Sequence, residues 1–296
     1  MSVVQRQVAS VTSVISAPSP FAFQPDESIE HGFVRVLGQL ALQARGLTQH
    51  AHGKLSESVH DTRVLIKCLR ALLWFSGPAF SSSEVNRAKS HLRRASHLLA
   101  AQRELVVMRS ILIRLAQKTE HRKYRRALAR IANAEDSQQA TIGRTGRLLR
   151  QAVGILLMTI KQIERRAKVN SRWPFCSDRL AQAFHAVHKA GKKALNSDDA
   201  TQFHDWRKKA KRLLFQLQLA QAVPGKRMAR TIERVYKLQG TLGDYHDCVI
   251  AQDRLRKNSS FEVPPLVVRR TLDLLEMRKH HLRKDARQIA RHIKSG

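Results

Sequence analysis

Apolar residues recur every three or four positions along most of the chain, which is the spacing that places side chains on one face of an α-helix. Between residues 26 and 49, for example, Ile29, Phe33, Leu37 and Leu40 form one such stripe. No long run of alternating β-branched residues predicts a strand, so the fold class is all-α. The predicted helices span residues 26–49, 59–75, 83–118 with a break near 101, 124–166, 178–195, 203–219, 226–239, 244–257 and 266–293.

Breaks in this periodicity predict the ends of helices and a boundary between two halves. Ser56 and Ser83 are the predicted N-caps of the second and third helices, because a serine oxygen can accept a hydrogen bond from a first-turn amide. Pro174 interrupts the pattern and predicts a linker over residues 169–177. The predicted organisation is a disordered arm at 1–25, a helical half at 26–168, the linker, and a second helical half at 178–296.

Two of the predicted helices repeat one motif 144 positions apart. The first reads VHDTRVLIKCLRALLWF (59–75) and the second FHDWRKKAKRLLFQLQL (203–219). Both begin with an apolar residue followed by His-Asp-x-Arg, and both carry a lysine four positions after the arginine. Residues three, four and seven apart share a helical face, so each helix presents a basic stripe opposite its apolar stripe. The first stripe is His60, Arg63 and Lys67 with Arg70 close to it, and the second is His204, Arg207, Lys208 and Lys211.

The repeat continues outside these helices, which predicts two halves of similar design that face one ligand surface. At an offset of 143, Arg87, His91 and Arg94 align with Arg230, Arg234 and Lys237. Each set has spacings of four and three, again a single helical face. Upstream, Arg45 aligns with Lys189 at the first offset, and these two residues are weaker candidates for the same surface.

The charge of the chain predicts a polyanionic partner. Lysine and arginine number 54 against 23 aspartate and glutamate residues, a formal net charge of +31. Self-repulsion at this level opposes compaction unless a polyanion or counterions offset it. A merely solvated basic surface is the simpler explanation, but the charges recur on defined helical faces. Aromatic residues make up only 5% of the chain, which disfavours binding of single-stranded nucleic acid by base stacking.

Other features bound the compartment and the chemistry. The three cysteines are widely spaced, predict neither a disulfide framework nor a zinc site, and fit a reducing cytoplasm. The longest apolar stretch, residues 153–160, is too short to span a bilayer, and residues 1–25 lack the continuous apolar core of a secretory signal. No phosphate-binding glycine loop, metalloprotease motif or nucleophile triad is evident, so we expect no enzyme activity, no metal and no cofactor.

At this point the chain resembles the CHAD family, the conserved histidine α-helical domain, over roughly residues 29–293. The resemblance rests on the two His-Asp-x-Arg helices, on LAAQRELVV (99–107), which resembles the family's Leu-Gly-x-x-Arg-Asp-x-Asp-Val segment, and on LQGTLGDYHD (238–247). It implies two four-helix bundles related by a pseudo-twofold axis, and binding of inorganic polyphosphate in a basic groove or central cavity between them. Family members are often fused to, or encoded with, triphosphate-tunnel enzymes, whose alternating Glu-x-Glu-x-Lys signature is absent here.

The sequence departs from the family pattern at several positions. Lys67 and Cys68 stand where arginine is common, Glu104 replaces aspartate, and Leu214 occupies the position that corresponds to Arg70. We interpret Asp61 and Asp205 as arginine partners or helix-start caps, and His246-Asp247 as a helix-start contact. The histidines of the two motifs are open to a structural reading and to a phosphate-facing one, and we favour the latter.

Together these observations predict a non-catalytic polyphosphate-binding protein that is targeted to polyphosphate granules or regulates polyphosphate-metabolising enzymes. The alternative is a non-specific nucleic-acid-binding protein that uses the same basic surface. The predicted ligand-facing set is His60, Arg63, Lys67, Arg70, Arg87, His91, Arg94, His204, Arg207, Lys208, Lys211, Arg230, Arg234 and Lys237.

Overall fold

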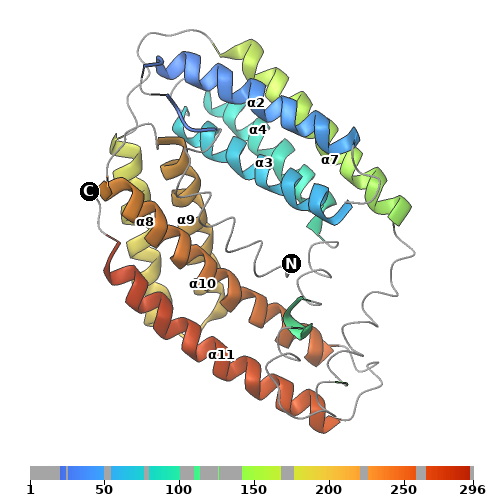
Figure 1. The fold of residues 1–296 in the computed structure, drawn as a ribbon, viewed down its shortest axis with the longest axis vertical. Helices are drawn as coiled ribbons and strands as arrows, with labels where there is room; N and C mark the ends of the chain where they lie inside the picture. The colour runs from blue at the N-terminus through green and yellow to red at the C-terminus, as the bar shows by residue number, and fades with distance from the viewer. Residues whose placement is uncertain are drawn as a thin grey trace.

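The computed structural model describes residues 21–24, 26–49, 55–76, 80–100, 110–113, 126, 142–167, 177–220, 226–257 and 265–293. Every regular element in these ranges is an α-helix, which confirms the all-α prediction. The helices whose bounds are described form two groups of four (Figure 1). One group holds α2 (Ile29–Gln49), α3 (Leu55–Phe75), α4 (Ser82–Leu98) and α7 (Ile142–Arg166). The other holds α8 (Ser177–Leu195), α9 (Ala200–Leu219), α10 (Lys226–Lys257) and α11 (Pro265–Arg291).

Each group is built around its own apolar cluster. In the first, Phe33, Leu37 and Leu40 of α2 pack with α3, α4 and α7. In the second, Phe203 and Trp206 of α9 pack with α8, α10 and α11. The helices that carry the repeated motif, α3 and α9, make the main helix–helix contact between the two groups in the described part of the chain. The pseudo-twofold relation between the groups stays a prediction.

Two contacts tie the ends of α3 and α9 to the opposite group. The amide of Phe23, which precedes α2, donates to the carbonyl of Leu219 at the end of α9, at 2.9 Å. Arg179 at the start of α8 donates to the carbonyl of Trp74 near the end of α3, and its guanidinium lies 5.2 Å from the centroid of that indole ring. The first group therefore holds the end of α9, and the second group holds the end of α3.

The boundaries differ from prediction in three places. The N-cap of α4 is Ser81, not Ser83, because Glu84 lies three residues after Ser81 and completes a capping box. Ser56 lies inside α3, which begins at Leu55. Phe21 and Ala22, which we had placed in a disordered arm, are buried: Phe21 packs in the first core.

The largest difference is α10, which is one continuous helix where we predicted a break between residues 239 and 244. Leu238, Leu242 and Tyr245 continue the buried stripe through that region. Gly240 and Gly243 each cost a helix about 1 kcal/mol relative to alanine, and burial of three large side chains outweighs this cost. The predicted break near residue 101, the linker at 169–176 and the Pro224-Gly225 stop lie outside the described residues.

Other predictions concern the cysteines and the membrane. Cys68 and Cys248 are buried free thiols, and burial raises the pKa of Cys68 to about 12. Both are therefore inert core residues, while Cys176 lies outside the described ranges. Among the described helices, none is long and apolar enough to cross a bilayer.

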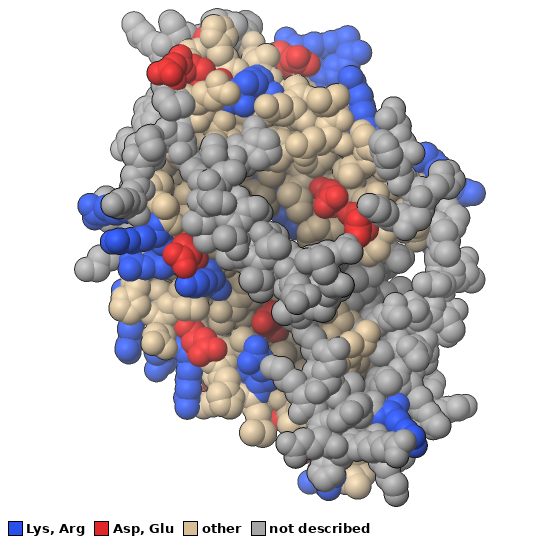
Figure 2. Space-filling model, in the orientation of Figure 1, with Lys and Arg blue, Asp and Glu red and all other residues tan. Residues whose placement is uncertain are grey.

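Surface charge alone does not locate a site. Figure 2 shows lysine and arginine side chains on both groups of helices, with aspartate and glutamate between them. A binding site must therefore be sought in how particular cations are placed relative to one another.

Candidate anion-binding site

Two lysines meet where α3 packs against α9. The side chains of Lys67 and Lys211 lie close enough to act on each other. Burial, followed by the charges of Lys211, Arg63 and Arg207, lowers the pKa of Lys67 from 10.5 to about 6. The charged neighbours that act most on this amine are thus all cations, and they come from both helices. We call Arg63, Lys67, Arg207 and Lys211 the central cluster.

Two histidines extend the central cluster toward α10. The ring centroids of His204 and His246 are 4.5 Å apart. Burial, then Arg207 and His204, lower the pKa of His246 to about 4. Burial, then Lys208 and Arg207, also lower the pKa of His204. Both rings are therefore neutral at physiological pH, and Nδ1 of His204 is buried without a hydrogen-bond partner among the described residues.

The local sequence explains why these side chains converge. On α3, Leu65, Leu69 and Leu72 are buried in the first core, so the Arg63 and Lys67 face turns away from it. On α9 the buried positions include Ala210, Leu213 and Leu217, which leaves Arg207 and Lys211 at the edge of the core. Gly243 places α10 beside Arg207: a Cβ at this position would lie 3.9 Å from the arginine Nε, an ordinary van der Waals distance.

Arg63 and Arg70 are anchored by the end of α4. Arg63 donates to the carbonyls of Ser96 and Leu99, at 3.1 and 3.4 Å. Arg70 donates to the hydroxyl of Ser96 at 3.3 Å. Burial, then the charges of Arg93 and Arg63, lower the pKa of Arg70. The two guanidiniums are thus held in place by neutral acceptors that leave their charge in force.

The predicted stripes on α4 and α10 are placed elsewhere. Arg87 lines a small pocket between α4 and α7 with Arg166. Arg234 donates to the carbonyl of His292 at 2.8 Å, and Lys237 pairs with Glu233 at 2.7 Å. Nδ1 of His91 is buried without a hydrogen-bond partner among the described residues. The remaining predicted residues lie on helix surfaces and are exposed: His60, Arg94, Lys208, Arg230, Arg45 and Lys189.

Two residues of this region were missed or misread from the sequence. His246 is not at a helix start but in the middle of α10, beside His204. Arg93, outside the predicted stripe, is the α4 cation whose charge acts on Arg70. The offset between the repeats aligns His246 with Arg103. This alignment indicated that position 246 is basic, but it did not indicate that His246 lies beside His204.

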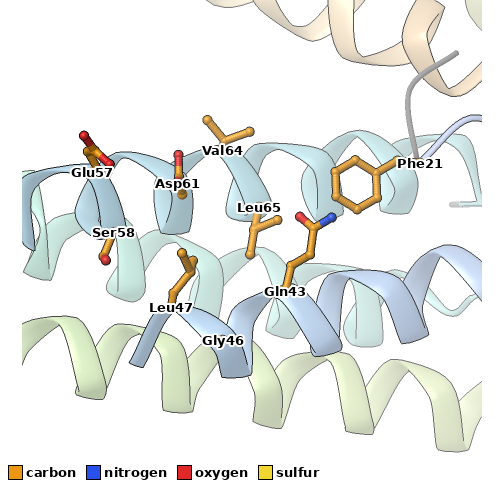
Figure 3. A pocket seen from close by; sticks show the side chains of 9 residues that line it. All are labelled: Phe21, Gln43, Gly46, Leu47, Glu57, Ser58, Asp61, Val64 and Leu65. Atoms are coloured by element: carbon orange, nitrogen blue, oxygen red, sulfur yellow. The ribbon is translucent and has the colours of Figure 1, made fainter. Parts of the chain in front are cut away.

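We interpreted the motif aspartates as arginine partners or helix-start caps, and no ion pair with a described arginine is found for either of them. Asp205 pairs with Lys209 at 2.8 Å, not with an arginine. Asp61 makes no ion pair with a described residue and lies, with Glu57, at a pocket of about 470 Å³ between α2 and α3 (Figure 3). Burial, then the charge of Glu57, raise the pKa of Asp61. In the described part of the chain no three histidine, cysteine or acidic residues are grouped as metal ligands.

Fold and site together define an all-helical protein in which two groups of helices bring cations of α3 and α9 together. The family model of the CHAD domain matches residues 37–256, and the chain therefore belongs to the CHAD family. This family is linked in general to polyphosphate binding.

A solved structure supports the fold. The crystal structure of the CHAD domain from the plant Ricinus communis is similar with a TM-score of 0.65, at 18% identity, over 94% of this chain and 98% of that chain. No curated protein matches the chain.

Proposed function

We propose that this protein binds inorganic polyphosphate at the central cluster, with His204 and His246 beside it. The observation that carries the proposal is the environment of Lys67, whose most influential charged neighbours are Lys211, Arg63 and Arg207. Like charges held together in a partly buried place raise the free energy of the ligand-free protein. A polyanion replaces this repulsion with attraction.

The residue types suit a chain of phosphates. Arg63 and Arg207 offer planar forks that can hold two phosphoryl oxygens, and the lysines offer point charges. The cluster contains no aromatic platform of the kind that stacks on bases. Cations from two facing helices focus positive potential between them. The function needs only donors and charge, so the proposal includes no catalytic step.

The family link supports this ligand, and the charge of +31 supports nucleic acid as the competitor. Nucleic acid would bind to the exposed cations on both groups of helices and would depend little on four residues. Polyphosphate granules and enzymes that act on polyphosphate are the cellular partners that the proposal implies.

A competition experiment tests the proposal. Labelled long-chain polyphosphate is displaced by duplex DNA or single-stranded RNA at equal phosphate concentration and fixed ionic strength. We expect polyphosphate to be preferred, and the preference to be lost when Lys67 and Lys211 are both replaced by methionine. Methionine keeps most of the apolar stem and removes the charge.

The matched control is Lys209→Met, which removes one lysine charge from the same helix where it pairs with Asp205. This variant should keep the preference. Equal or tighter nucleic-acid binding, or a preference that survives the double substitution, would reject the central cluster as a polyphosphate site.

A further inference from the structure

A second set of basic side chains lines a pocket between α8 and α11 that shares no residue with the central cluster. His188 and Lys192 reach it from α8, and Arg287 and Arg291 from α11. Its volume of about 360 Å³ lies in the size range of small-molecule sites, roughly 300–1,000 Å³. None of the described residues that line it is an aspartate or a glutamate.

The four basic side chains have no partner in the described part of the chain. None of His188, Lys192, Arg287 and Arg291 donates a side-chain hydrogen bond or forms an ion pair with a described residue. The nearby acidic turn is engaged elsewhere. Asp198 pairs with Arg283, and Asp199 accepts from the amide of Thr201 as the N-cap of α9. The positive charge of the pocket is therefore not balanced by the two aspartates of this turn.

A buried indole supplies an independent observation at the same place. Trp206 lines the pocket and is 0% exposed, and its Nε1–H has no hydrogen-bond acceptor among the described residues. A buried donor without an acceptor is costly and usually signals a missing partner. Gly191 also lines the pocket, and a Cβ there would lie 3.1 Å from this nitrogen. Gly191 thus adds no side chain over the N–H edge of the indole, which lines the pocket but is closed to solvent.

Helix dipoles explain only part of the arrangement. Lys192 and Arg291 lie in the last turns of α8 and α11, where positive charge is favoured. His188 and Arg287 lie one turn earlier, beyond the reach of that effect, and the dipole does not account for the indole donor.

We propose that this pocket is a second anion site, which takes a phosphate-type oxyanion between the cations of α8 and α11 with the Trp206 N–H as a neutral donor. The oxyanion is either a free phosphate or pyrophosphate, or a segment of a polyphosphate chain. The proposal does not depend on the central cluster.

The test uses the full-length protein labelled with 5-fluorotryptophan. The chain has three tryptophans, Trp74, Trp173 and Trp206, whose ¹⁹F resonances are assigned by single replacement with phenylalanine. Inorganic phosphate, pyrophosphate and long-chain polyphosphate are titrated separately, with chloride at matched ionic strength as the reference. We expect a saturable shift of the Trp206 resonance with at least one phosphate and none with chloride. A shift with phosphate or pyrophosphate identifies a free anion, and a shift with polyphosphate alone identifies a chain segment.

Variants separate this site from the central cluster. Some of the titrated anions should shift the Trp206 resonance. Replacement of Arg287 and Arg291 by glutamine should lower the affinity for such an anion by about tenfold or more. The control replaces Arg269 and Arg270 by glutamine, which are exposed at the other end of α11, and should change the shift little.

The Lys67→Met, Lys211→Met protein should keep the Trp206 response even where long-chain polyphosphate binding is lost at the central cluster. Trp206→Phe keeps the aromatic packing and removes the N–H. Calorimetry should show that this variant binds the same anion more weakly. No saturable Trp206 shift with any phosphate, or a shift unaltered by the Arg287 and Arg291 replacements, overturns the proposal.

Discussion

The cations of α3 and α9 and those of α10 come from the same kind of sequence pattern but have opposite surroundings. In the central cluster Lys67 is surrounded by Lys211, Arg63 and Arg207, and its pKa falls to about 6. On the outer face of α10, Arg234 donates to a helix-end carbonyl and Lys237 pairs with Glu233. A cation beside cations has electrostatic energy to gain from an anion, whereas a cation beside a carboxylate has already gained it. The comparison teaches that partner identity, not the number of basic residues, marks a binding site.

The largest expected effect is on affinity. Replacement of Arg207 by glutamine and Lys211 by methionine should weaken polyphosphate binding about 100-fold, because two charge-assisted contacts are lost. The same charge change on α10, Arg234→Gln with Lys237→Met, should weaken it no more than about threefold. Isothermal calorimetry at fixed salt measures both, and equal losses in the two proteins would erase the distinction between the regions.

Proton uptake should accompany binding to the central cluster. Burial, then the charges of Lys211 and Arg63, lower the pKa of Lys67 to about 6, so at about pH 7.5 this amine is largely neutral in the ligand-free protein. A bound polyanion favours the ammonium form, raises that pKa and draws protons from solution. Calorimetry in buffers of different ionisation enthalpy should show uptake approaching one proton.

The Lys67→Met protein is the control for this coupling, and it should take up markedly fewer protons. Uptake that is the same in both proteins, or no uptake in the parent, would contradict the assignment to Lys67.

The stability of the ligand-free protein should depend on pH because of His204 and His246. Burial holds the folded pKa of His204 and His246 below 6.5, that of His246 at about 4, so the unfolded chain binds more protons than the folded one between these values. The ligand-free protein should therefore lose stability as pH falls from 6.5 to 4. Urea denaturation across this range should show a shallower loss in His246→Gln, and an unchanged slope would refute the linkage.

Removal of the Lys67 amine should stabilise the ligand-free protein while it weakens binding. Its folded pKa lies below 10.5, so the penalty is complete below about pH 6 and fades as pH rises toward 10.5. At neutral pH, Lys67→Met should raise Tm by about 2–4 °C for each kcal/mol recovered. A lower Tm for this variant would show that Lys67 contributes to the fold.

The smallest effect is expected at Lys209. Its pair with Asp205 is partly exposed, so Lys209→Met should change the free energy of unfolding by less than about 1 kcal/mol. Polyphosphate affinity should change only slightly. A loss comparable to that of the Arg207 and Lys211 replacements would mean that net charge governs binding.

Particular residues show which features of the fold and the site could be predicted from the sequence. The two His-Asp-x-Arg helices were located by their motif, and the convergence of Lys67 with Lys211 followed from the expectation of a shared surface. Ser81 as the cap of α4 could have been found, since Glu84 follows it at the spacing of a capping box. His246 could not be paired with His204, because no local pattern states that α10 runs beside α9 at that point.

The sequence by itself determined the helical class, the two motif helices and which of their faces is basic, because helical periodicity depends only on neighbours along the chain. The tertiary structure decided which basic faces meet. It packed α3 against α9, so that like charges share a partly buried place, and it turned Arg234 of α10 toward the end of α11. It also kept α10 continuous across Gly240 and Gly243, because burial of the neighbouring apolar side chains outweighs the local preference for a break.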